Sequence, residues 1–135
     1  MINKQVIVIT LLLLLMISVS ACRSEEPVNV SVDGAIIETG LAIDDDLRII
    51  SPQTTFKAGE DFYFYFYNNG NFNSERLTVQ LVDSRNDKVL AEHTYEVEPG
   101  ENSLTDGIFF GSPGSFLVTV RIDGLVRATR QIIIE

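Results

Sequence analysis

Residues 61–67 read Asp-Phe-Tyr-Phe-Tyr-Phe-Tyr, and this strict alternation constrains the fold more than any other part of the sequence. Successive side chains of an extended chain point to opposite faces. Three phenylalanines therefore share one face and three tyrosines the other: Phe62, Phe64 and Phe66 against Tyr63, Tyr65 and Tyr67. The phenylalanine face predicts a buried sheet surface, whereas the tyrosine face suits either further packing or a binding surface.

Short alternating runs of this kind recur along the chain between turn-forming residues such as Asn68-Asn69-Gly70. No sustained stretch after residue 27 carries apolar residues at helical spacing. Strands are predicted over residues 28–32, 35–43, 62–67, 77–82, 89–97, 103–110, 116–122 and 126–134. Seven or eight short strands in a chain of this length predict an all-β fold, a two-sheet antiparallel β-sandwich.

The last two predicted strands are joined around Gly124, and their register has to place apolar residues of both strands on one face. A two-residue loop would pair Val120 with Arg127, which violates that requirement. A three-residue loop over residues 122–124, with Gly124 in the left-handed conformation, pairs Val120 with Val126 and is the predicted register. Replacing Gly124 by a residue with a Cβ is then expected to be costly.

The chain begins with an apolar run over residues 6–17, which Lys4 precedes and small residues ending at Ala21 follow. This pattern is typical of a secretory signal peptide. A permanent transmembrane anchor is the alternative, although the run is shorter than the roughly 20 residues that a membrane-spanning helix needs. Residues 1–21 are therefore left out of the predicted fold.

Residues 19–22 read Val-Ser-Ala-Cys, and here the chain resembles bacterial lipoprotein precursors, whose lipobox places small residues directly before an invariant cysteine. The resemblance implies cleavage before Cys22 and attachment of a diacylglyceryl group to its thiol, often with acylation of the new amino terminus. Two or more acyl chains give stable membrane attachment where one chain does not. Ordinary cleavage after Ala21, which would leave a free thiol, is the alternative.

Composition limits what else the chain can hold. Cys22 is the only cysteine, which excludes disulfides and thiolate metal clusters within one chain. Loss of Lys4 with the signal peptide lowers the net charge from −9 to −10, so the mature chain is expected to avoid nucleic acid and anionic lipid. Residues 22–34 are predicted to be the lipidated cysteine and a short tether, and residues 35–135 a single domain.

The predicted domain resembles the immunoglobulin-like and fibronectin type III-like sandwiches of bacterial surface lipoproteins. Three segments carry the resemblance: FKAGEDFYFYFYN, EVEPGEN and GSPGSFLVTVRIDG. These are folding motifs, and the chain lacks the tryptophan and the cysteine pair of antibody domains. The resemblance therefore implies the fold and no particular ligand.

The strongest candidate binding face is the stripe formed by Tyr63, Tyr65 and Tyr67. Tyrosine is favoured at interfaces because it combines a stiff apolar ring with a hydroxyl group. It also suits the exposed face of a strand, so plain packing remains the alternative. The loops over residues 68–72 and 101–107 are further candidates, and an edge strand could recruit an extended peptide by strand addition.

Other polar residues give weaker signals. The carboxylates of Asp44, Asp45 and Asp46 could approach calcium, but consecutive acids lack the spacing of a calcium loop and predict a solvated turn. His93, the only histidine, is predicted to be partly buried and structural. The sequence has no Gly-x-Ser-x-Gly elbow and no phosphate-binding loop, so we expect neither an enzyme nor a cofactor or metal site.

The sequence therefore predicts a lipid-anchored binding or accessory module of the cell envelope, whose partner is a protein or a surface polysaccharide. A small protease inhibitor is the first alternative, since sandwich domains resembling the bacterial intracellular proteinase inhibitor share this size and strand pattern. A structural envelope lipoprotein without a discrete site is the second. Arg23, where lipoproteins retained in the inner membrane carry aspartate, implies the outer membrane if the cell has one, and otherwise the outer face of the cell membrane.

Overall fold

The structure is a computed structural model, and it describes residues 26–135. All regular secondary structure in that range is β-strand, which confirms the predicted all-β class. Between residues 26 and 135 no helix is found that could span a membrane. The predicted signal peptide and the predicted lipidation site at Cys22 lie outside the described residues.

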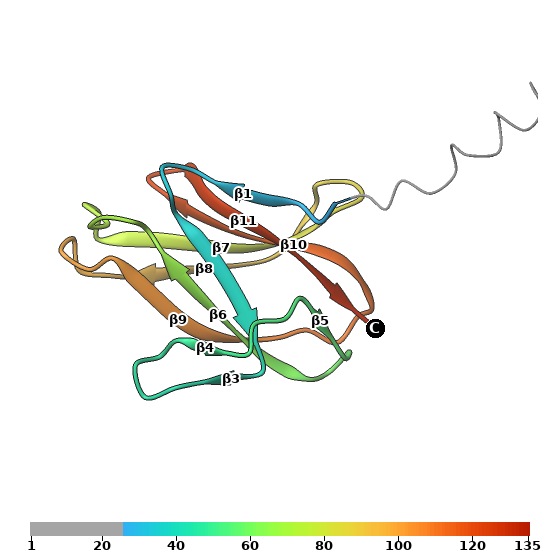
Figure 1. Cartoon of the computed structure of the whole chain (residues 1–135). Helices are drawn as coiled ribbons and strands as arrows, with labels where there is room; N and C mark the ends of the chain where they lie inside the picture. Colours follow the sequence, from blue (N-terminus) through green and yellow to red (C-terminus); the bar gives the residue numbers. More distant parts are fainter. Residues whose placement is uncertain (1–25) are drawn as a thin grey trace, which may run out of the picture.

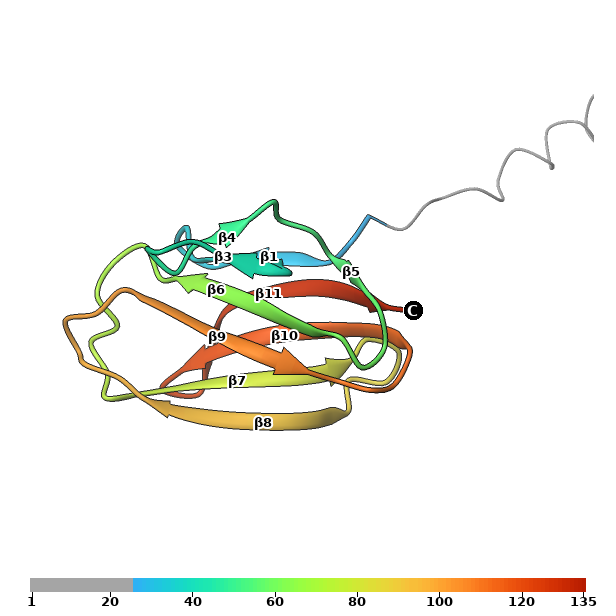
Figure 2. The same ribbon diagram turned by 90° about the horizontal axis from the view of Figure 1, so that it is seen from below.

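Two sheets pack face to face as an immunoglobulin-like sandwich (Figures 1 and 2). The larger sheet has the order β1 (Asn29–Ser31), β11 (Leu125–Ile134), β10 (Gly114–Ile122), β7 (Arg76–Asp83) and β8 (Val89–Glu96), and β5 (Thr55–Phe56) also pairs with β11. The smaller sheet has the order β2 (Ile36–Gly40), β6 (Asp61–Tyr67) and β9 (Ser103–Phe109). A separate hairpin consists of β3 (Ala42–Ile43) and β4 (Ile49–Ile50).

The core lies between the two sheets, and β6 supplies its centre. Burial alternates along β6 as the sequence predicts, because Phe62, Phe64 and Phe66 are fully buried. They belong to one apolar cluster with Val118 and Val120 of β10, which lie in the opposite sheet. The period-two pattern of the sequence therefore identifies the core face correctly.

The seven strands of five or more residues match predicted strands, but the run predicted over residues 35–43 is interrupted. β2 ends at Gly40, and the hairpin of β3 and β4 folds back over the outside of the smaller sheet. Gly40 is needed there because a Cβ at this position would lie 2.5 Å from Cγ2 of Ile49. The sequence does not predict β4 or β5, because a two-residue strand shows no alternation.

The hairpin of β10 and β11 has a two-residue loop, so the predicted three-residue loop is wrong. Ile122 pairs with Leu125, and the loop residues Asp123 and Gly124 have positive φ values of 51° and 78°. Two consecutive positive φ values are the geometry of the tight turn that Asp-Gly favours between twisted strands. Gly124 does adopt the left-handed conformation, as predicted.

A β-bulge at Arg127 explains how the two-residue loop keeps the apolar faces together. The pairing skips Arg127, so that Val120 lies opposite Ala128 and both are fully buried. The Arg127 guanidinium then binds two neighbouring loops: its Nε donates to Oδ1 of Asn68, just after β6, at 3.0 Å and its Nη1 to Oδ2 of Asp33, in the turn after β1, at 3.3 Å. One inserted residue therefore corrects the register that the turn alone would misplace.

Two short strands cover the free edge of β11. β1 pairs with residues 128–130, and β5 pairs in parallel with Ile133 and Ile134. Between them the backbone N–H of Gln131 donates to the carbonyl oxygen of Val28 at 2.9 Å. Because β1 belongs to this sheet, the folded part begins before Ala35, the predicted domain boundary.

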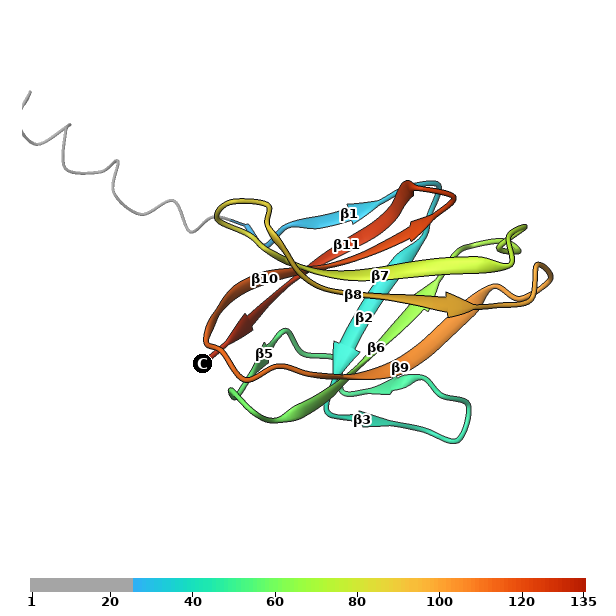
Figure 3. The same ribbon diagram turned by 180° about the vertical axis from the view of Figure 1, so that it is seen from behind.

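The two ends of the sandwich carry different parts of the chain (Figures 1 and 3). The described chain begins at the end that holds the C-terminus and the turn between β7 and β8. The opposite end holds the β6–β7 loop, the β8–β9 loop and the turn at Asp123 and Gly124. An anchor at the start of the chain would therefore leave these loops at the far end of the domain.

Candidate functional site

The predicted tyrosine face lies on the outer side of the smaller sheet. Tyr63, Tyr65 and Tyr67 project from β6, which is the central strand, and all three are half-buried. The ring of Tyr63 lies beside Gly107 of β9, with its Cε1 3.8 Å from where a Cβ of Gly107 would be. Tyr63 therefore has a local packing role, because its ring covers the strand at a residue that lacks a side chain.

The hairpin of β3 and β4 covers part of this face. Ile49 of β4 packs on Gly40, at the end of β2. At the hairpin tip, the Thr105 hydroxyl of β9 donates to the carbonyl oxygen of Leu47 at 2.6 Å. The hairpin therefore lies across the small sheet from β2 to β9, and it leaves only part of the tyrosine face free.

A polar hollow of about 890 Å³ remains beside Tyr65 and Tyr67. The hairpin contributes charged groups to its wall, including Asp44 and Arg48. Oδ1 of Asp44 accepts hydrogen bonds from the backbone N–H groups of Asp46 and Arg48, both at 2.9 Å. This carboxylate therefore stabilises the exposed turn. Within residues 26–135, no group of three or more His, Cys, Asp or Glu residues could hold a metal ion.

The sandwich is open on the side where β8 and β9 lie. Within residues 26–135, β8 pairs with β7 alone and β9 pairs with β6 alone, so each strand has one edge that no described strand covers. Between these strands is a cavity of about 300 Å³, which we call the β8–β9 opening. The sequence alone did not lead us to predict this opening.

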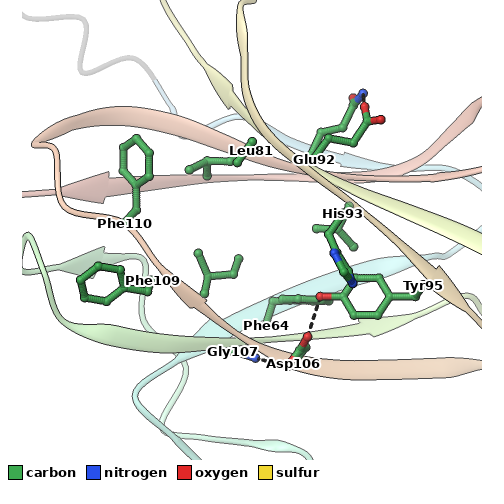
Figure 4. Close-up of a pocket in the computed structure, with 13 residues that line it drawn as sticks. Phe64, Leu81, Glu92, His93, Tyr95, Asp106, Gly107, Phe109 and Phe110 are labelled. Carbon is green, nitrogen blue, oxygen red and sulfur yellow. Dashed lines mark hydrogen bonds between the residues drawn. The ribbon is translucent and has the colours of Figure 1, made fainter.

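The β8–β9 opening has an apolar floor and an aromatic rim (Figure 4). Phe64, Val79 and Leu81 form its floor and belong to the buried core. Phe109, the last residue of β9, and Phe110, which follows it, lie at one end, and the Phe109 side chain is 67% exposed. The floor itself is buried, and the exposed apolar surface of the opening belongs to rim residues such as Ala91 and Phe109.

A hydrogen bond between the two sheets forms the other end of the opening. The Tyr95 hydroxyl of β8 donates to Oδ2 of Asp106 of β9 at 2.6 Å (Figure 4). The Tyr95 ring lies edge to face with Phe64, with ring centroids 6.4 Å apart. Burial, together with the Asp106 carboxylate, raises the pKa of Tyr95 well above its ordinary value, so the hydroxyl remains a donor at neutral pH.

His93 is exposed, so the prediction of a partly buried histidine is wrong. Its register places it on the inner side of β8 opposite the buried Val79, as the sequence implies. No strand of the smaller sheet covers that position, however, and the imidazole instead packs edge to face on Tyr95 with ring centroids 4.4 Å apart. His93 therefore lines the opening.

Negative charge surrounds the β8–β9 opening. Residues 89–110, which include β8, β9 and the loop between them, contain no lysine or arginine. The same segment contains five acids: Glu92, Glu96, Glu98, Glu101 and Asp106. The opening therefore combines an apolar interior with acidic surroundings, which favours an apolar ligand that carries positive charge.

One signal in the sequence could have indicated the opening. The inner face of β8 reads Ala91, His93 and Tyr95, whereas the neighbouring strand β7 presents Leu77 and Val79 on that face. A strand whose inner face is small or polar is one that the opposite sheet does not fully cover. The candidate loop 101–107 also changes role, because most of it is strand β9.

No protein-family model matches this chain, and no curated protein matches it significantly.

Proposed function

We propose that this chain is a binding module of the cell envelope, anchored by lipid on Cys22, that holds a protein partner at the β8–β9 opening. The observation that carries this proposal is the apolar cavity of the opening, whose rim exposes Ala91 and Phe109 above a floor of core residues such as Phe64. Binding is favoured when a partner removes apolar surface from water. An aromatic rim beside polar groups is also typical of interfaces.

The tyrosine face is the other surface that could serve the same function. The β3–β4 hairpin covers part of it, and the hollow beside Tyr65 and Tyr67 is lined mainly by polar groups. Polar surface is already stable in water, so its burial gains little. The β8–β9 opening is therefore the better-supported site.

The lipid anchor remains a proposal that rests on the sequence around Cys22. It is compatible with the fold, because the described chain begins at one end of the sandwich and β8 and β9 run along its side. A domain attached at that end would expose the β8–β9 opening laterally. A labelled fatty acid incorporated by the wild-type protein and not by Cys22→Ser would support the anchor, and equal labelling of both would contradict it.

Photo-crosslinking in cells tests the binding site. A photoreactive residue is placed at Ala91 or at Phe109, which lie on the two sides of the opening, and in control proteins at Tyr65 or at Val30. Val30 is exposed on β1, at the opposite edge of the larger sheet from β8, where it pairs with Thr129. We expect one partner to be captured from Ala91 and Phe109 but from neither control position.

Each other result has a definite meaning. Capture from Tyr65 alone would move the site to the tyrosine face. No specific capture from any position would favour a structural lipoprotein without a discrete site. Tight, stoichiometric inhibition of a protease by the purified domain would instead support the inhibitor alternative.

A further inference from the structure

The unpaired edge of β8 adds a second property to the opening. β8 contains eight residues, pairs with β7 alone and, apart from Tyr95, consists of exposed residues. A free strand edge is a template for another extended chain, and proteins commonly protect such edges with lysine or proline. Between Val89 and Glu96 the chain has neither. The edge therefore remains available to an additional strand.

Charge decides what kind of strand fits this edge. The outer face of β8 carries Glu92 and Glu96, and the segment that continues to residue 110 has no lysine or arginine. A second copy of this chain, pairing through its own β8, would bring these glutamates together, and like charges on neighbouring strands are destabilising. A basic segment would instead place opposite charges side by side.

We propose that β8 accepts, by strand addition, an extended basic segment of a protein partner, with one bulky apolar side chain entering the β8–β9 opening. This inference rests on the proposed binding function of the opening and adds the chemistry of the partner. Main-chain hydrogen bonds to the edge provide attachment, and the opening selects the inward side chain.

The alternation of β8 specifies the pattern that the segment should have. Residues opposite Ala91, His93 and Tyr95 face inward, toward the opening, whereas residues opposite Glu92 and Glu96 face outward. The partner should therefore have apolar residues at inward positions and lysine or arginine at two outward positions, four residues apart. A large ring is expected at the inward position nearest Ala91, because Ala91 leaves the most space.

Binding of a synthetic peptide to the purified domain tests this inference. The probe is the acetylated and amidated peptide Lys-Val-Lys-Phe-Lys-Val-Lys with a fluorescent label, and fluorescence anisotropy measures its affinity. We expect binding that weakens with added salt. Replacing the peptide phenylalanine by alanine, or methylating alternate backbone nitrogens, should each weaken binding about tenfold or more, and replacing lysine by glutamate should abolish it.

Matched variants of the protein locate the binding. Ala91→Trp fills the opening and should weaken binding of the peptide about tenfold or more, whereas Val30→Trp, on β1 at the opposite edge of the larger sheet, should leave it nearly unchanged. The double variant Glu92→Lys with Glu96→Lys should reverse the preference toward the glutamate peptide. Unchanged urea unfolding of each variant shows that the fold is intact.

Several outcomes would overturn the inference. These are absence of binding, equal binding of the methylated peptide, or equal loss of binding in Ala91→Trp and Val30→Trp. If cellular crosslinking from Ala91 and Phe109 still captured one partner, the binding function would stand and only the basic strand would be wrong. If both experiments failed, the proposed site itself would be wrong.

Discussion

The two edges of the larger sheet differ in how far neighbouring strands cover them. At one edge, β1 and β5 border β11, whose inward residues Ala128, Ile132 and Ile134 are at most 2% exposed. At the other edge β8 has no neighbour beyond β7, and its inward residues Ala91 and His93 are exposed. One edge is completed by local strands, and the other is left incomplete.

The chain supplies short strands to one edge of the larger sheet and not to the other. Two segments that are separate in sequence, Asn29–Ser31 and Thr55–Phe56, both close the β11 edge. An open edge exposes unpaired backbone N–H and C=O groups to water, which favours association with another chain. The edge that the chain leaves unpaired is therefore the one at which we proposed a partner.

The largest expected effect is the difference in stability loss between removing an aromatic side chain at the closed edge and removing one at the open side. Phe56 of β5 is 2% exposed and stacks on Phe62 with ring centroids 4.3 Å apart. Phe56→Ala should lower the free energy of unfolding by about 3–5 kcal/mol. Phe109→Ala removes an equal side chain that is 67% exposed, and should change it by about 0.5 kcal/mol or less.

Urea unfolding followed by circular dichroism measures both changes. If Phe109→Ala were as destabilising as Phe56→Ala, the open side would be part of the folding core, and its assignment as a binding site would fail. If Phe56→Ala were nearly neutral, β5 would not be the element that closes the β11 edge.

The buried core and the longer strands were predicted well from the sequence. Period-two alternation identifies Phe62, Phe64 and Phe66 as core residues, because strand geometry alone links the pattern to burial. The spacing of turn residues also located the seven longer strands. The end of β2 at Gly40 and the bulge at Arg127 were not predicted. Both depend on a neighbouring strand, β4 at Gly40 and β10 at Arg127, and not on the local sequence pattern.

The opening could not be read from the sequence in the same way. Which strand lies at an edge depends on the spatial order of strands, and β8 and β9 meet on one side only because each pairs with a single neighbour. His93 shows the consequence, since its register was inferred correctly and its burial was not. The tyrosines had the opposite outcome: their face was predicted, but not the hairpin that covers part of it.

The next effect concerns the hydrogen bond that limits the opening. Tyr95→Phe keeps the ring but removes the 2.6 Å hydrogen bond to Asp106, and should lower the free energy of unfolding by about 2 kcal/mol. The pKa of Tyr95 is raised in the folded state, mainly by burial and then by Asp106. Its stabilising contribution is therefore complete below about pH 10, the usual tyrosine value, and decreases as the pH rises further.

Unfolding of wild type and Tyr95→Phe at neutral and alkaline pH measures this contribution. The difference between the two proteins should shrink above about pH 10. A difference that is already absent at neutral pH would show that the Tyr95 hydroxyl does not connect the two sheets in solution.

A smaller effect is expected at the turn that precedes the closed edge. Gly124 has a φ of 78°, and no atom lies within 4 Å of the point that a Cβ would occupy, so Gly124→Ala should be costly through backbone conformation alone, by about 1 kcal/mol. Gly100, in the loop between the two open strands, also has free space but no positive φ. Gly100→Ala should be neutral or slightly stabilising, and equal losses in both variants would contradict this explanation.

The smallest effect concerns the turn from which the open strand starts. Two side-chain hydrogen bonds from Arg85, at 2.8 and 3.1 Å, hold the pKa of Asp83 at about 2, below its ordinary 3.8. A carboxyl whose pKa is lowered by folding stabilises the protein above the ordinary pKa and loses that effect as the pH falls toward about 2. Arg85→Ala should therefore be slightly less stable than wild type at neutral pH, and the difference should shrink as the pH falls through about 2.

Hydrogen exchange shows where this loss acts. β8 is held on one side only, so a looser turn in Arg85→Ala should speed amide exchange in β8, while β11, which has neighbours on both sides, should not respond. Lys88→Ala should have less effect than Arg85→Ala, because Lys88 contributes least to the lowered pKa of Asp83. Equal acceleration in β8 and β11 would mean that the two edges unfold together, and that the open strand is no more available to a partner than the closed one.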